Sequence, residues 1–254
     1  MATHSPVSRH HFSASDGTDL VWHEMGAGRP VVLIHGYFSS AFINWIRYGH
    51  AGKLAAPGFR VIMPDLRAHG DSGKPHDPAA YPPDILADDN LALIDHLGLK
   101  DYDLGGYSLG GRTVARMLAR GAAPGRAIIA GMGLAGLIDT ASRSGFFRKV
   151  LTKLGSFERG SSEWMTEAFL KTSGGDPKAL LLILDTFVDT PEPALRAIEI
   201  PVLALGGKDD EDNGSIDSLS RILPKGQHVT VPGNHMSAVV APEFGNAMVD
   251  FLTA

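Results

Sequence analysis

The pentapeptide Gly106–Gly110 reads Gly-Tyr-Ser-Leu-Gly, which is a G-x-S-x-G pattern centred on Ser108. A serine hydroxyl is a poor nucleophile unless a base removes its proton and N–H groups stabilise the oxyanion that results. The pattern lies between a short apolar run, Tyr102–Gly106, and a helix-like run, Arg112–Ala119. A sharp strand-to-helix turn with glycines beside it would expose the hydroxyl and aim the amide N–H of Leu109 at the developing charge. The pattern therefore predicts that Ser108 is a catalytic nucleophile.

A serine nucleophile needs a histidine base, and the base needs a carboxylate that orients it. His235 is the candidate base, because it follows a strand and a Pro-Gly turn directly before the last predicted helix. Asp209 is the candidate carboxylate, because it follows the apolar run Val202–Leu205. Loops that follow parallel strands leave the same edge of a sheet, so these side chains can meet Ser108. One alternative for the carboxylate stays open within the same acidic run, namely Asp210.

The elements that must position these residues follow from hydrophobic periodicity. Predicted strands are the short apolar or alternating runs 12–15, 20–24, 30–34, 59–63, 102–106, 127–130, 202–205 and 228–231. Predicted helices cover 41–54, 84–97, 112–119 and 244–252. Strands that alternate with helices indicate an α/β fold. We expect a mostly parallel, doubly wound sheet of about eight strands, with helices on both faces.

Residues 136–198 form an interval too long for a simple crossover between two strands. Its apolar residues fall into three or four amphipathic groups separated by glycines and a proline. We therefore expect a core made of residues 1–135 and 199–254, with residues 136–198 inserted as a helical cap.

Composition excludes several classes of function. The chain has 254 residues, a formal net charge of −5, and no cysteine. The absence of cysteine excludes disulfides and a thiol nucleophile, and the absence of a basic stripe argues against nucleic acid as a partner. No histidine and carboxylate spacing typical of metal ligands is found, so no metal and no cofactor is expected. The first 20 residues lack the apolar core of a signal peptide, and no apolar run is long enough to span a bilayer. We expect a cytoplasmic protein that acts on a small molecule and does not bind membranes; the oligomeric state stays open.

Four further segments, in the correct order around Ser108, make the chain resemble the α/β-hydrolase family, in its serine-nucleophile branch with a helical cap. His35–Phe38 is similar to the family's HG motif, and Pro64–Ser72 to its D-x-R-G-H-G-x-S loop, with alanine at position 68. Gly206–Asp209 is similar to the G-x-x-D segment that carries the acid, and Pro232–His235 to the segment that carries the base. The resemblance covers nearly the whole chain.

The resemblance implies a role for each matching residue. Ser108 would attack an acyl carbon, His235 would take and later return the proton, and Asp209 would hold the imidazole. Some family members place the acid after the sixth strand instead, which makes Asp139 a second alternative for the carboxylate. The backbone N–H groups of Tyr37 and Leu109 would form the oxyanion hole. Family members that attack saturated carbon use aspartate at the position of Ser108, so the serine favours acyl substrates such as esters, lactones and thioesters.

The substrate pocket is expected between the sheet edge and the cap. Its candidate lining residues, beside Tyr37 and Leu109, are Phe38, Tyr107, Leu137, Trp164 and Met236. These side chains are mainly apolar, which predicts a small, largely apolar ester with little charge. The two arginines near the motifs, Arg67 and Arg112, are expected to brace the loop and the helix that carry them. Alternatives are a C–C bond hydrolase or a perhydrolase on the same triad, and a small-molecule receptor with slow turnover.

Overall fold

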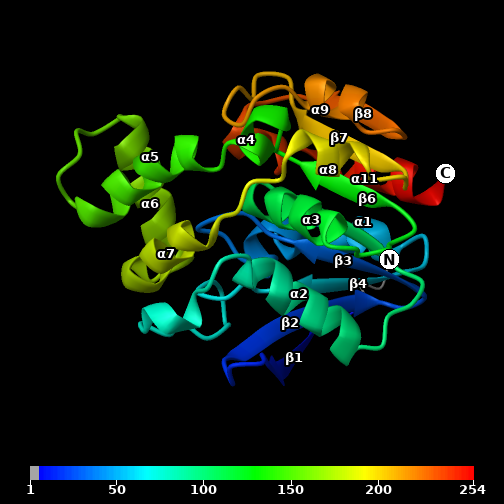
Figure 1. The fold of residues 1–254 in the computed structure, drawn as a ribbon, viewed down its shortest axis with the longest axis horizontal. Coiled ribbons are helices and arrows are strands. Elements are labelled where there is room, and N and C mark those ends of the chain that lie inside the picture. The colour runs from blue at the N-terminus through cyan, green and yellow to red at the C-terminus, as the bar shows by residue number, and fades with distance from the viewer. Residues whose placement is uncertain (1–5) are drawn as a thin grey trace.

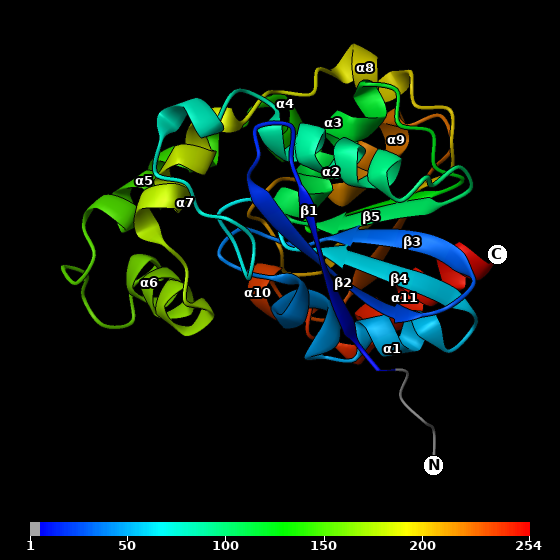
Figure 2. The same ribbon diagram turned by 90° about the horizontal axis from the view of Figure 1, so that it is seen from below.

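The computed structural model describes residues 6–254, and these form one eight-stranded sheet with helices on both faces (Figures 1 and 2). The spatial order of the strands is β1-β2-β4-β3-β5-β6-β7-β8. Strands β1 and β2 form an antiparallel hairpin at one edge, β2 pairs antiparallel with β4, and all other neighbours are parallel. In chain order the strands are β1 (Ser8–Ser13), β2 (Asp19–Gly26), β3 (Arg29–Ile34), β4 (Phe59–Pro64), β5 (Asp103–Tyr107), β6 (Ala127–Ala130), β7 (Val202–Gly207) and β8 (Gly226–Val231). The predicted α/β class with a mostly parallel sheet is confirmed.

Two helical layers cover the sheet, because its central strands are apolar on both faces. Helices α2, α3 and α9 lie on one face, and α1 and α11 lie on the other (Figure 2). The helices are α1 (His50–Ala55), α2 (Ile85–His96), α3 (Leu109–Ala119), α4 (Leu134–Ile138), α5 (Ala141–Thr152), α6 (Ser162–Ser173), α7 (Pro177–Ile183), α8 (Glu192–Arg196), α9 (Ile216–Ile222), α10 (His235–Ala238) and α11 (Pro242–Thr253), with short helical turns at Phe42–Ile46, Pro78–Ala80 and Leu184–Thr186. No helix within residues 6–254 is long and apolar enough to cross a membrane.

The segment expected to be a single helix over 41–54 is two pieces in the structure. A short π-helical segment covers Phe42–Ile46, and α1 begins only at His50. Gly49 separates them with a φ of 78°, a left-handed conformation that glycine adopts at little cost. The expectation of one continuous helix was wrong, because the helical spacing of apolar residues continues on both sides of Gly49 and does not reveal the break.

Helices α4 to α8 occupy the long interval between β6 and β7. The first and the last of them, α4 and α8, pack against α3 and α9 of the sheet layer. Between them α5 packs on α6 and α7, and this group stands beyond the edge of the sheet (Figure 1). The division into a core and a cap at 136–198 stays a prediction; in the structure, the part that stands apart is α5 to α7.

Candidate active site

Ser108 stands in the sharp turn between β5 and α3, where its backbone has a φ of 55° and a ψ of −113°. A non-glycine residue in such a conformation is strained, and this strain recurs at functional sites. The turn brings α3 against the strands so closely that two neighbouring glycines have no space for a side chain. A Cβ on Gly106 would lie 2.3 Å from the Gly110 carbonyl carbon, and a Cβ on Gly110 would lie 2.0 Å from the Ile34 carbonyl oxygen. The glycines therefore allow the turn that presents the Ser108 hydroxyl.

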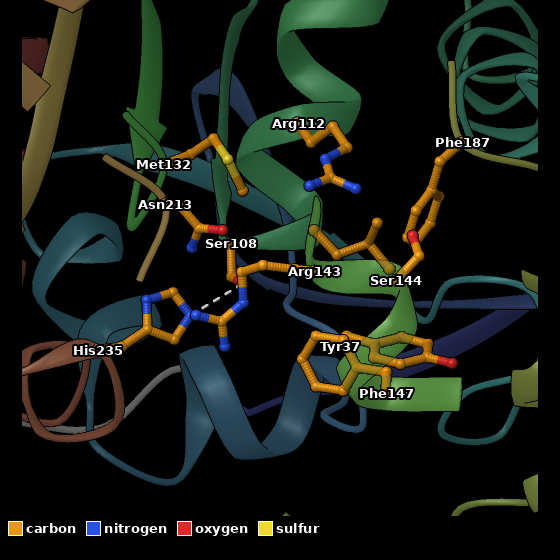
Figure 3. Close-up of a pocket in the computed structure, with 11 residues that line it drawn as sticks. Tyr37, Ser108, Arg112, Met132, Arg143, Ser144, Phe147, Phe187, Asn213 and His235 are labelled. Atoms are coloured by element: carbon orange, nitrogen blue, oxygen red, sulfur yellow. Dashed lines mark hydrogen bonds between the residues drawn. The ribbon is translucent and has the colours of Figure 1, made fainter. Parts of the chain in front are cut away.

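The structure brings Ser108 together with His235 and with Asp210. The Ser108 Oγ lies 3.0 Å from His235 Nε2 (Figure 3). On the other side of the ring, His235 Nδ1 lies 2.8 Å from the Oδ2 of Asp210. A carboxylate can only accept here, so Nδ1 carries the proton and Nε2 is free to accept from the serine hydroxyl. The side chains come from three loops at the carboxyl ends of β5, β7 and β8. This is the serine–histidine–carboxylate geometry that general-base activation of a hydroxyl requires.

The expectation that Asp209 orients the histidine was wrong, and its neighbour Asp210 takes this place. Asp209 is exposed, and its backbone N–H donates to the carbonyl of Gly233. Within residues 6–254 its carboxylate makes no contact with His235. The Asp210 N–H donates to the Gly207 carbonyl, and this hydrogen bond turns the chain back after β7. In this turn the Asp210 side chain is only 8% exposed. Its other oxygen accepts from the Asp212 N–H at 3.1 Å.

The second alternative, Asp139, lies at the end of α4 and takes no part in this arrangement. Its Oδ1 accepts from the backbone N–H of Ser142 in α5. Among residues 6–254 only Asp210 pairs with His235.

Tyr107 fixes the position of His235 from the strand before the nucleophile. Its ring stacks on the imidazole with centroids 5.3 Å apart, and its hydroxyl donates to the His235 carbonyl. Burial raises the pKa of Tyr107 well above its ordinary value, so the phenol remains a donor. Tyr107 therefore holds His235 in place and does not line the substrate pocket as expected.

The loop after β3 carries the predicted second oxyanion donor, Tyr37. His35 holds this loop, since its Nδ1 donates to the Gly36 carbonyl at 2.8 Å and its Nε2 accepts from the Leu66 N–H at 3.0 Å. Burial lowers the pKa of His35, which keeps the ring neutral in this role. Within residues 6–254, the amides of Tyr37 and Leu109 donate to no protein acceptor, so both remain free for an oxyanion.

A cavity of about 380 Å³, open mouth included, surrounds Ser108 (Figure 3). It is lined by Tyr37, Ser108, Leu109, Arg112, Met132, Arg143, Ser144, Phe147, Phe187, Asn213 and His235. The lining combines aromatic side chains from α5 and from the segment after α7 with two arginines. The cavity wall thus contains two charged side chains beside the apolar ones that were expected, and the ester with little charge stays a prediction.

The five further residues predicted to line the pocket, Phe38, Tyr107, Leu137, Trp164 and Met236, do not line this cavity. Phe38, Tyr107 and Leu137 are buried in the packing behind it, whereas Trp164 and Met236 are exposed, 37% and 56% respectively. These predictions rested on nearness in sequence to the motifs. Side chains that follow one another on a strand or loop point in different directions, so nearness does not place them in the same cavity.

The two arginines near the motifs differ. Arg67 is buried and paired with both Asp16 and Asp89, as expected of a residue that braces its own loop. Arg112, expected to brace α3, instead lies in the cavity wall and makes no side-chain hydrogen bond within the described part of the chain.

The fold and this site together define the class of protein: the chain has the α/β-hydrolase fold. Residues 29–151 match the family model described as "alpha/beta hydrolase fold". A non-heme haloperoxidase from Rhodococcus erythropolis is 29% identical, over 78% of this chain and 81% of the relative. Several further curated relatives are matched over less than half of their own length.

Solved structures agree over almost the entire chain. A bromoperoxidase from Bacillus anthracis superposes with a TM-score of 0.76 and 25% identity, covering 97% of this chain and 100% of the other. An esterase from Thermogutta terrifontis superposes with a TM-score of 0.77 and 23% identity, covering 97% and 98%. At that identity the second likeness shows the fold alone.

Proposed function

We propose that the protein is a serine hydrolase that cleaves small carboxylic esters, or related lactones and thioesters, through an acyl-enzyme. One observation carries the proposal: the Ser108 hydroxyl, held on a strained turn, lies within hydrogen-bond distance of an imidazole whose far nitrogen is held by a buried carboxylate. The α/β-hydrolase fold is consistent with it, but the reaction is inferred from the site.

The proposed mechanism assigns each group a step. Ser108 Oγ attacks the ester carbonyl carbon while His235 Nε2 takes its proton, and Asp210 stabilises the imidazolium. The N–H groups of Tyr37 and Leu109 receive the negative oxygen, a contribution of about 3 kcal/mol for each such donor. The C–O bond to the alcohol then breaks as His235 protonates the leaving oxygen. Water, deprotonated by the same histidine, attacks the acyl-enzyme and releases the acid.

The test is intact-protein mass after exposure to a fluorophosphonate, which reacts with activated serines. We expect one adduct on the wild-type protein and none on Ser108→Ala. As a control, Ser144→Ala removes the other serine hydroxyl of the cavity wall and should leave the adduct unchanged. A folded wild-type protein that forms no adduct would contradict the proposal and would favour a receptor with slow turnover.

The similarity to a non-heme haloperoxidase favours a second candidate, in which hydrogen peroxide replaces water as the acyl acceptor. Attack of H₂O₂ on the acyl-enzyme would release a peracid, which can itself oxidise a halide ion. We expect the ratio of peracid to acid formed from ethyl acetate to rise with peroxide concentration if this reaction operates. A ratio that stays at the level of Ser108→Ala would exclude it.

A further inference from the structure

Arg112 places a buried positive charge in the wall of the active-site cavity. It lies one helical turn after Ser108 on α3, and only 7% of the residue is exposed. Its Nε is fully buried with no hydrogen-bond partner. Within residues 6–254 the guanidinium forms no ion pair either, although an unpaired buried charge is costly.

The surroundings of Arg112 do not neutralise it. Phe187 covers one face of the guanidinium, with the Cζ 4.7 Å from the ring centroid. Asp189 and Asp139 attract the charge from beyond ion-pair distance, and Arg143 repels it. Arg143 itself is already paired with Asp212 at 2.9 Å, so Arg112 carries the uncompensated charge.

Burial lowers the pKa of Arg112 to about 10, which still leaves the side chain charged at neutral pH. The cavity thus holds a fixed cation whose free N–H donors face the space above Ser108 (Figure 3). Arg67 is the instructive contrast within the same chain. It is also buried, yet it is fully partnered by Asp16 and Asp89. The buried guanidinium of Arg67 thus has two acidic partners, whereas that of Arg112 has none within residues 6–254.

We propose that the ester substrate carries a carboxylate, and that Arg112 binds this group inside the cavity while Ser108 attacks the carbonyl. This inference rests on the proposed function and names its substrate class. A guanidinium offers paired parallel donors that match a carboxylate. One uncompensated guanidinium pairs with one carboxylate group. Arg112 follows Ser108 by four positions, a helical rise of about 6 Å, which a short dicarboxylic monoester can span.

The experiment compares matched neutral and anionic esters, with ethanol or acid release as the readout. On the acyl side, ethyl pentanoate is compared with monoethyl glutarate, and shorter and longer homologues of both are included. On the alcohol side, butyl acetate is compared with 4-acetoxybutanoate. For at least one pair, we expect the wild-type kcat/KM to favour the anionic ester tenfold or more. In Arg112→Met this preference should fall at least 30-fold, mainly through KM, and Arg112→Lys should recover part of it.

Arg120→Gln is the control, because Arg120 ends the same helix but pairs with Asp88 away from the cavity. It should keep the wild-type preference. A binding measurement tests this inference independently of the proposed function, because binding needs no turnover. Glutarate in tenfold excess over its Kd should raise the Tm of the wild-type protein by about 3 °C and leave that of Arg112→Met unchanged.

The inference is overturned if the wild-type protein hydrolyses the neutral esters but prefers them to every anionic partner. It is also overturned if Arg112→Met keeps the preference and the glutarate shift, or if inorganic phosphate raises the Tm and glutarate does not. A glutarate shift without hydrolysis of any ester would support the carboxylate site and count against the hydrolase proposal alone.

Discussion

Replacing Asp210 by asparagine should lower kcat by about 10⁴-fold on any ester that the wild-type protein hydrolyses, because an amide cannot hold the imidazole in the tautomer that accepts the serine proton. The Asp210 carboxylate accepts from His235 Nδ1 at 2.8 Å and is almost fully buried. An asparagine there can turn its NH₂ group toward Nδ1 and place the proton on Nε2, where it blocks general-base action. The fold should survive, since the substitution keeps the volume of the side chain.

The matched control is Asp209→Asn, one position earlier in the same acidic run. The Asp209 side chain is exposed, so its loss should change kcat less than twofold. Steady-state rates of the two variants on one ester, with circular dichroism to verify folding, decide the assignment. Equal activity losses in the two variants, or a loss confined to Asp209→Asn, would refute the placement of Asp210.

Removing the nucleophile should have an even larger effect: Ser108→Ala is expected to lower kcat by about 10⁶-fold. The reason is that His235 and Asp210 act only through the Ser108 hydroxyl, to which Nε2 is hydrogen-bonded at 3.0 Å. Groups that act as one unit give non-additive losses. The double variant Ser108→Ala with His235→Ala should therefore be no slower than Ser108→Ala alone.

Rates for Ser108→Ala, for His235→Ala and for the double variant, measured at high enzyme concentration and corrected for spontaneous hydrolysis, test this expectation. If the double variant loses the product of the two single effects, the two residues act independently and the proposed shared mechanism fails. Residual activity above the uncatalysed rate is expected in all three, because the amides of Tyr37 and Leu109 remain in place.

The features that could be read from the sequence are those determined by local patterns. The G-x-S-x-G pattern predicted the turn at Ser108, because a strand that reverses into a closely packed helix requires glycine at positions 106 and 110. The alternation of apolar runs predicted the sheet and its parallel character, since strands buried on both faces need such runs. Parallel strands in turn end at one edge of the sheet, which is why His235 could be expected near Ser108.

Which carboxylate orients the histidine could not be predicted from the sequence. The spacing G-x-x-D fits twice, as Gly206 to Asp209 and as Gly207 to Asp210. A difference of one residue turns a side chain to another side, and only the backbone bond from Asp210 to Gly207 decides which aspartate faces the histidine. The sequence therefore matched the pattern at both aspartates and gave no basis for preferring Asp210 over Asp209.

Only the tertiary structure determines which residues line the cavity. Its residues come from the loop after β3, from α3, α5 and α10, and from the segments that follow β6, α7 and β7, which meet only when the chain is folded. Whether a buried arginine finds an acidic partner depends on these long-range neighbours, and so Arg67 and Arg112 look alike in the sequence. The sequence by itself determined the fold and the turn that presents Ser108, because both follow from short-range periodicity and backbone conformation. The carboxylate, the cavity lining and the unpaired charge of Arg112 required the folded structure, because each depends on which distant side chains come into contact.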